Sequence, residues 1–313
     1  MEIKRSKRNK LLIVGGTGFI GKHVVKKALE LNFKITVISK NKPKTKNKFP
    51  GVSYLIVDIS NKKKLRYALK NLTFSYIINL GGYINHSNYF KRGSLTLSTH
   101  YEGIKNLFDS INRSKLKRFV QVGSSDEYGN NLAPQHENQR EAPISIYSCA
   151  KVLATYFLQT LHKTENFPVV ILRPFLVYGP DQGKDRFIPQ IIRGCISDSK
   201  FPVSKGDQLR DFLYIDDFVN AVFKCLILKN VIGEVINISS GIPTLIKDVV
   251  NKISYITKSG KPQFGKINYR KGENMVLYAD INKAKKLLNW KPKISLEQGL
   301  YKTIKNYKKL YEK

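Results

Sequence analysis

A glycine-rich turn between an apolar run and a helical pattern constrains the fold of this chain more than any other feature. Residues 11–14 are all aliphatic, which is typical of a buried strand, and residues 22–31 carry apolar side chains at close to helical spacing. The turn between them, Gly15-Gly16-Thr17-Gly18-Phe19-Ile20-Gly21, fits the pattern G-x-x-G-x-x-G. Glycines permit a tight turn and let backbone N–H groups approach a pyrophosphate at the start of the helix. The sequence therefore predicts a dinucleotide-binding turn, with a plain strand-to-helix connection as the alternative.

The same alternation continues through the first half of the chain. Further predicted strands cover residues 34–38, 52–57, 76–80, 118–122 and 168–172. Predicted helices lie at residues 61–71, 95–113 and 146–163. Strands that alternate with helices form βαβ units, whose strands run parallel. The predicted fold class is therefore α/β, with a Rossmann-type doubly wound parallel sheet.

The regular alternation of predicted strands and helices ends after residue 173. Residues 175–213 are punctuated by prolines and predicted to be mostly loop, whereas 243–313 are mostly helical in pattern. We expect a dinucleotide-binding domain over residues 1–173 and a smaller, substrate-binding domain over 174–313. Part of 213–240 is expected to return to the first domain.

The formal net charge of +32 raises the question of a polyanionic partner. Only 12 of the 55 basic residues are arginine, the side chain that binds phosphates and base edges with two parallel hydrogen bonds. The lysines are spread over predicted loops and helix faces. A solvated lysine-rich surface is therefore favoured over nucleic-acid binding, and its positive field would also attract an anionic substrate.

Cysteine, histidine and hydropathy patterns exclude several classes. Cys149, Cys195 and Cys225 are too far apart for a disulfide framework or a Cys-x-x-Cys zinc site, and the histidines show no metal-ligand spacing. A signal peptide needs about 7–15 apolar residues and a membrane helix about 20, and neither pattern is visible. The expectation is a cytoplasmic protein with no metal site and no membrane segment.

Three residues bear on how a dinucleotide would bind. Ser39 and Lys40 follow the second predicted strand, where NAD-binding proteins usually carry an acidic residue. Lys40 could meet the 2′-phosphate of NADP, or it could be one more surface lysine. Asp58, at the end of the third strand, could accept a hydrogen bond from an adenine amino group or only cap a helix. The expected cofactor is NAD, with NADP as the alternative.

A tyrosine and a lysine four residues apart form the candidate catalytic pair. The spacing of Tyr147 and Lys151 places the phenol and the ammonium on one helix face. A nearby cation lowers a tyrosine pKa, which makes Tyr147 a usable general base. Just after the strand at 118–122, Ser124 offers a hydroxyl that could bind the reacting oxygen of the substrate.

These motifs together resemble the extended short-chain dehydrogenase/reductases, the NAD-dependent epimerase/dehydratase family that acts on nucleotide sugars. The resemblance covers nearly the whole chain. Its motifs are Gly-Gly-Thr-Gly-Phe-Ile-Gly at 15–21, Ser-Ser…Tyr-Gly at 124–129, Tyr147…Lys151, Leu-Arg-Pro-Phe at 172–175, Arg-Asp-Phe at 210–212, Arg270…Glu273 and Trp-Lys-Pro at 290–292.

The resemblance implies a role for each matching residue. Tyr147 would take the proton from a sugar hydroxyl, usually on C4, while hydride passes to the nicotinamide. Lys151 would hold the nicotinamide ribose, and Ser124 would bind the reacting oxygen. Ser125 and Asp126 match the acid–base pair of the dehydratases in this family. The implied substrate-binding residues are Ser124, Arg186, Arg210 and Arg270. The implied cofactor-binding residues are Gly15, Thr17, Gly18, Phe19, Ile20, Gly21, Ser39, Lys40, Asp58, Ile59, Leu80, Gly81, Tyr147, Lys151 and Pro174.

Several reactions share the first oxidation. A nucleotide-sugar 4-dehydrogenase or 4-epimerase is favoured, followed by an NADPH-dependent 4-keto-sugar reductase and then by a 4,6-dehydratase. Asp126 is one methylene shorter than the glutamate usual in dehydratases, and Leu176 stands where many epimerases carry asparagine. The alternative from another class is a non-catalytic protein that binds RNA or another polyanion. Relatives commonly dimerise, so we expect a homodimer formed through the helices at 95–113 and 146–163.

Overall fold

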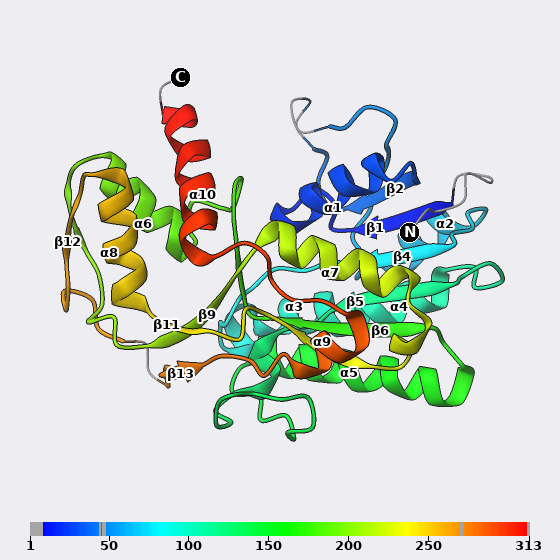
Figure 1. Ribbon diagram of the computed structural model, residues 1–313. Helices are drawn as coiled ribbons and strands as arrows, with labels where there is room; N and C mark the ends of the chain where they lie inside the picture. The colour runs from blue at the N-terminus through cyan, green and yellow to red at the C-terminus, as the bar shows by residue number, and fades with distance from the viewer. Residues whose placement is uncertain (1–8, 44, 46–47, 270–271, 312–313) are drawn as a thin grey trace. The chain divides into compact units, whose positions relative to one another are not determined.

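The computed structural model describes residues 9–43, 45, 48–269 and 272–311 (Figure 1). The chain divides into two compact units. Unit 1 contains residues 1–130, 140–173 and 219–236, and unit 2 contains residues 131–139, 174–218 and 237–313.

A seven-stranded sheet forms the centre of unit 1, in the order β10-β6-β5-β4-β1-β2-β3. Its strands are β1 (Lys10–Val14), β2 (Lys34–Ser39), β3 (Ser53–Ile56), β4 (Tyr76–Asn79), β5 (Arg118–Val122), β6 (Val169–Pro174) and β10 (Val235–Ile238). The pairings from β3 across to β6 are all parallel. The strand order reverses between β1 and β4, and ligands bind beyond the carboxyl ends of strands at such a reversal. The predicted fold class is confirmed.

Burial explains why the strands were visible in the sequence. The aliphatic side chains of Leu11, Leu12, Ile13 and Val14 are at most 2% exposed, on both faces of the strand. A parallel sheet is covered on both faces, so its central strands are continuous apolar runs rather than alternating ones.

The helices of unit 1 follow the predicted positions with one difference. They are α1 (Phe19–Glu30), α2 (Lys62–Leu69), α3 (Ser94–Leu97), α4 (Gly103–Ser110) and α5 (Ile146–Glu165), while α7 (Ile215–Ile227) crosses from unit 2 into unit 1. The predicted helix at 95–113 is interrupted by the π-helical turn η3 (Ser98–Glu102), which follows a second such turn, η2 (Tyr89–Gly93). π-Helical turns are frequent at functional sites.

Unit 2 is built on a four-stranded sheet in which β9 (Leu209–Tyr214) pairs with β7 (Leu176–Tyr178), β11 (Pro243–Leu245) and β13 (Val276–Leu277). A two-stranded sheet joins β8 (Lys200–Pro202) to β12 (Lys261–Gln263). The helices of unit 2 are α6 (Phe187–Ile196), α8 (Ile246–Thr257), α9 (Asn282–Leu288) and α10 (Leu296–Tyr311).

The prediction of a mostly loop segment at 175–213 is wrong, because α6 lies within it. Ile188, Ile191, Ile192 and Cys195 are buried along one face of this helix at helical spacing. Pro189 suggested a break, but it occupies the first helical turn, where a backbone N–H has no partner within the helix and proline is tolerated.

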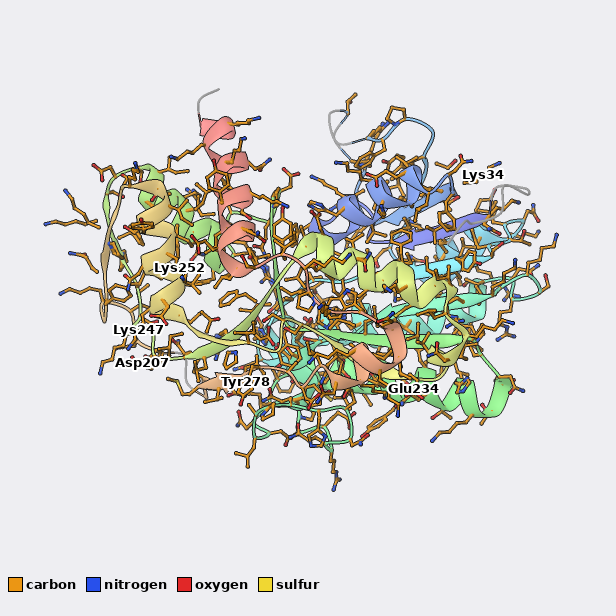
Figure 2. The ribbon with its side chains drawn as sticks, in the orientation of Figure 1. Lys34, Asp207, Glu234, Lys247, Lys252 and Tyr278 are labelled. Carbon is orange, nitrogen blue, oxygen red and sulfur yellow. The ribbon has the colours of Figure 1, made fainter. Side chains whose placement is uncertain are left out.

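Surface charge in unit 2 is partly paired. Figure 2 shows Lys247 beside Asp207, with Nζ 3.5 Å from Oδ1, and Lys252 further along α8. Both partners of the pair are about half exposed, so the interaction contributes little to stability. No helix within the described ranges is long and apolar enough to cross a membrane, and none of these residues form a group of three or more potential metal ligands.

Candidate active site

Close backbone approach explains the glycines of the turn after β1. Gly15 has a φ of +76°, and a Cβ there would lie 2.9 Å from the Leu80 carbonyl oxygen, beyond the end of β4. A Cβ at Gly21 would lie 2.2 Å from the Gly15 oxygen. Because neither position has room for a side chain, the turn stays tight and its backbone remains accessible to a ligand.

The start of α1 suits a negatively charged group. Gly18 is the N-cap, no side chain caps the helix, and its first turn contains no acidic residue. The first N–H groups of a helix have no partner within the helix and carry a partial positive charge. Phe19 and Ile20, two of the predicted cofactor residues, form the first turn itself. The arrangement therefore fits the pyrophosphate of a dinucleotide.

Lys40 and Asp58 form an ion pair beyond β2 and β3. Lys40 Nζ lies 2.9 Å from Asp58 Oδ2, while Ser60 donates to Oδ1 from its backbone N–H and its hydroxyl. Burial acts to raise the pKa of Asp58, but the hydrogen bonds from Lys40 and Ser60 outweigh it and hold that pKa below its ordinary value. Ser39 is buried and donates its hydroxyl to the Asn41 carbonyl. The side chains of Lys40 and Asp58, both candidate cofactor-binding residues, thus bind each other.

The segment after β4 approaches the same turn from the other side. Gly81 donates its N–H to the Asn79 side chain, and a Cβ at Gly81 would meet Val14 at 2.8 Å. Ile59 is 5% exposed and packs beside Gly81 and Gly103. These contacts fix the backbone at Leu80 and Gly81 close to the glycine turn.

Tyr147 and Lys151 lie on α5, one turn apart, as their spacing predicted. Both are almost fully buried, and Lys151 Nζ lies 5.9 Å from the centre of the Tyr147 ring. The ammonium donates to the Val122 carbonyl at the end of β5, at 2.9 Å. Burial lowers the pKa of Lys151 to about 8, although Glu127 and Asp126 act to raise it. Lys151 therefore remains mostly charged at neutral pH, where its ammonium favours the phenolate of Tyr147.

The turn after β5 carries two acidic residues, Asp126 and Glu127, and the contacts of Glu127 give it a structural role. Glu127 is fully buried, where it accepts from the Ser124 N–H at 2.8 Å and from the Thr155 hydroxyl at 2.8 Å. The buried guanidinium of Arg173 pairs with Glu127 at 2.8 Å and with Glu141 at 2.5 Å. Glu127 is thus a structural group that fixes the backbone of Ser124.

Two histidines, His86 and His100, flank the ring of Tyr147, and neither is among the predicted site residues. The His100 ring centre lies 5.1 Å from that of Tyr147, and the His86 ring centre 5.4 Å. Burial and the Lys151 charge lower the pKa of His100 to about 3, so it is neutral, and its Nε2 lies 2.8 Å from the Tyr83 carbonyl oxygen. Gly82 makes room for it, since a Cβ there would lie 2.1 Å from the His100 ring.

Comparison with known proteins identifies the family of this chain. The sequence profile of the NAD dependent epimerase/dehydratase family matches residues 11–239. The chain belongs to this family.

Relatives and solved structures agree with the assignment to the epimerase/dehydratase family. The chain is 29% identical to a UDP-glucuronate 4-epimerase of Thermodesulfobacterium geofontis, over 79% of this chain and 77% of that protein. It is 27% identical to a dTDP-D-glucose 4,6-dehydratase of Dictyostelium discoideum, over 96% and 81%. The structure of a UDP-glucuronic acid 4-epimerase from Bacillus cereus, in complex with UDP-glucuronic acid and NAD, superposes with a TM-score of 0.87 at 29% identity, covering 96% of this chain and 100% of that one.

Three further predicted residues of this family member, Pro174, Arg186 and Arg210, lie in unit 2. Arg210, on β9, is 8% exposed and donates from Nη2 to Glu273 Oε1 at 2.5 Å and from Nη1 to the Leu209 carbonyl. Arg186 precedes α6 as its N-cap, and Pro174 ends β6. Arg270 lies outside the described residues.

Proposed function

We propose that this protein is an NAD-dependent nucleotide-sugar oxidoreductase that acts at C4 of the sugar, as a 4-epimerase. The observation that carries the proposal is the buried pair Tyr147 and Lys151, on α5. The glycine turn at the start of α1 supplies the anion-binding backbone that a dinucleotide needs. A protein that only bound polyanions would have no use for a tyrosine with a cation one helical turn away. The relatives named as 4-epimerases support the choice among reactions.

The chain's own residues would act as follows. The α1 N-terminus binds the pyrophosphate, and Lys151 hydrogen-bonds the nicotinamide ribose. Tyr147, as phenolate, removes the proton from the C4 hydroxyl, and Ser124 donates a hydrogen bond to the oxygen that becomes a ketone. When bound, NAD accepts the hydride from C4 and can return it. Arg210 binds the diphosphate of the nucleotide sugar, because a guanidinium matches two phosphate oxygens at once.

The test begins with the purified protein. It is denatured, and the released dinucleotide is identified together with its redox state. The holoenzyme is then incubated with UDP-glucose, UDP-glucuronic acid, UDP-N-acetylglucosamine and dTDP-glucose, and the products are analysed by NMR. We expect NAD and a C4 epimer of one of these sugars. An unsaturated or 6-deoxy-4-keto product would instead identify a 4,6-dehydratase, for which Asp126 is the supporting residue.

We expect the Lys40–Asp58 ion pair to favour NAD over NADP. Asp58 holds the ammonium that could otherwise meet a 2′-phosphate, and its carboxylate repels that phosphate. In Asp58→Asn, the ratio of the affinity for NAD to the affinity for NADP should therefore fall by about tenfold. This corresponds to about 1.4 kcal/mol of binding free energy. Calorimetric titration with both dinucleotides measures it. The matched control is Asp109→Asn, which breaks the exposed ion pair with Lys62. An unchanged preference in Asp58→Asn would contradict this role.

The lowered pKa of Lys151 predicts opposite trends of activity and stability with pH. Activity should fall as pH rises through about 8, because the ammonium loses its proton. The pKa of an unfolded lysine is about 10.4, so between about pH 8 and 10.4 the unfolded chain binds more protons at this position, and folding stability rises with pH. Chemical denaturation of wild type and Lys151→Met across this window isolates the contribution. Parallel curves for the two proteins would show that the residue does not titrate there.

We also propose that the protein is a homodimer through α3 and α5. These helices pack on each other within unit 1. Their outer side chains Leu95, Leu153 and Tyr156 are 61%, 38% and 48% exposed, which is costly for apolar groups without a partner. Sedimentation at micromolar concentration should give the mass of two chains, and Leu153→Glu should give one. A wild-type monomer would contradict the proposal.

A further inference from the structure

A chain of hydrogen bonds runs from the outer side of α5 to the turn that carries Ser124. At its inner end, Glu127 Oε1 accepts from the Ser124 N–H at 2.8 Å. The other oxygen, Glu127 Oε2, accepts from Arg173 Nε at 2.9 Å and from Arg173 Nη2 at 2.8 Å. The same Nη2 donates to Glu141 Oε1 at 2.5 Å, and the Tyr156 hydroxyl donates to Glu141 Oε2. Tyr156 and Glu141 are therefore connected to Ser124 through two buried side chains.

Two carboxylates share one guanidinium in this chain of hydrogen bonds. The side chains of Arg173 and Glu127 are fully buried and that of Glu141 is 10% exposed, so solvent screens their charges little. Burial acts to raise the pKa of Glu141, but hydrogen bonds from Tyr156 and Arg173 outweigh it and hold that pKa below its ordinary value. The hydrogen bond to Glu141 raises the pKa of Tyr156, so the phenol keeps the proton that it donates. Tyr156 thus helps to keep Glu141 charged and in place beside Arg173.

Helix α5, which carries the proposed catalytic pair, holds both of these carboxylates. Thr155 donates to Glu127 Oε2 at 2.8 Å, and the adjacent Tyr156 donates to Glu141. The Ala142 N–H donates to the Glu127 carbonyl oxygen at 3.2 Å, so the segment that contains Glu141 also lies against the turn after β5. These contacts join the turn to the helix.

The proposed function requires groups from both elements to reach one atom of the substrate. In it, the Ser124 hydroxyl donates to the C4 oxygen while Tyr147 takes the proton, and the present inference rests on that function. We propose that Glu141 and Tyr156 are positioning residues for hydride transfer. Through the buried ion pair they fix the turn after β5 against α5, so that the Ser124 hydroxyl and the Tyr147 phenol meet at the same oxygen. A misplacement of about 1 Å can cost about 10²-fold in rate, so groups that act only through others can control this step.

Single-turnover reduction of bound NAD by the nucleotide sugars separates positioning from folding. The amplitude reports the fraction of folded, loaded protein, and the rate constant reports hydride transfer within that fraction. Tyr156→Phe and Glu141→Gln should lower the rate constant by about five- to tenfold and leave the amplitude unchanged. A merely structural role would lower the amplitude and leave the rate constant unchanged, which would contradict the inference. The matched control is Tyr301→Phe, which changes a tyrosine that is 59% exposed on α10 and should react at the wild-type rate.

A double-mutant cycle tests whether Tyr156 acts through Ser124. Ser124→Ala removes the hydroxyl and keeps the backbone N–H that Glu127 binds. With no hydroxyl left to position, adding Tyr156→Phe to Ser124→Ala should change the rate constant by less than about twofold. A loss of the same size in both backgrounds would overturn the inference, because the effect would then not pass through Ser124.

Amide exchange tests the inference without any turnover. NAD-loaded protein is transferred to deuterated water, and deuterium uptake by the peptide that covers residues 123–129 is followed by mass spectrometry. Uptake should be at least about threefold faster in Tyr156→Phe and Glu141→Gln, because the acceptor of the Ser124 N–H is held less firmly. Wild-type uptake in both variants overturns the inference, even where hydride transfer is slowed. Absence of NAD reduction by any of the sugars in wild type would instead overturn the proposed function, and the uptake would still decide whether Glu141 and Tyr156 hold the turn.

Discussion

Replacing Tyr147 by phenylalanine is expected to lower the rate of hydride transfer by about 10²–10⁴-fold, the range that a general base contributes. The phenol is buried and next to the Lys151 ammonium, and its oxygen is the proposed acceptor of the C4 proton. Phenylalanine keeps the ring and its packing against both histidines. The fold and the bound NAD should therefore survive. Single-turnover reduction of the cofactor measures the rate, and analysis of the denatured protein measures the NAD content.

Tyr67→Phe is the matched control, because that tyrosine lies on α2 and is 84% exposed. It should behave as wild type. If Tyr147→Phe turned over at the wild-type rate, the phenol would have no role in the mechanism. Loss of both NAD and the thermal transition would show instead that the hydroxyl is needed for folding.

Replacing Arg173 by methionine should lower the free energy of unfolding by about 3–5 kcal/mol, the usual cost of removing one partner of a buried ion pair. The guanidinium is fully buried between Glu127 and Glu141, and its Cζ lies 4.7 Å from the centre of the Tyr128 ring. Without it, the Glu127 carboxylate is left buried without its compensating charge. The loss is a large fraction of the 5–15 kcal/mol by which folded proteins are typically stable. Equilibrium denaturation in urea measures it.

The control for this effect is Arg66→Met, at an exposed position on α2, which should change stability by less than about 0.5 kcal/mol. The variant Arg173→Met should also slow hydride transfer, because Glu127 fixes the backbone N–H of Ser124. A loss of less than about 1 kcal/mol would contradict the expected cost of leaving the Glu127 carboxylate buried without its ion-pair partner.

The parallel sheet and the local motifs could be predicted from the sequence alone. Residues 11–14 predicted a strand because both faces of β1 are buried, which leaves a continuous aliphatic run. The glycine turn was visible because Gly15 and Gly21 have no room for a Cβ. Tyr147 and Lys151 were found because a helix converts a spacing of four residues into proximity.

The side-chain pairs that form between strand ends could be seen only in the folded chain. No local sequence pattern predicts that His86 lies beside Asp126, or that Lys40 pairs with Asp58. Each pair joins segments that follow different strands. The two adjacent acids Asp126 and Glu127 also look equivalent in the sequence. Burial against Arg173 makes Glu127 structural, while Asp126 stays accessible. Spacing along a chain fixes contacts within one helix or turn, whereas contacts between strand ends depend on the order of strands in the sheet.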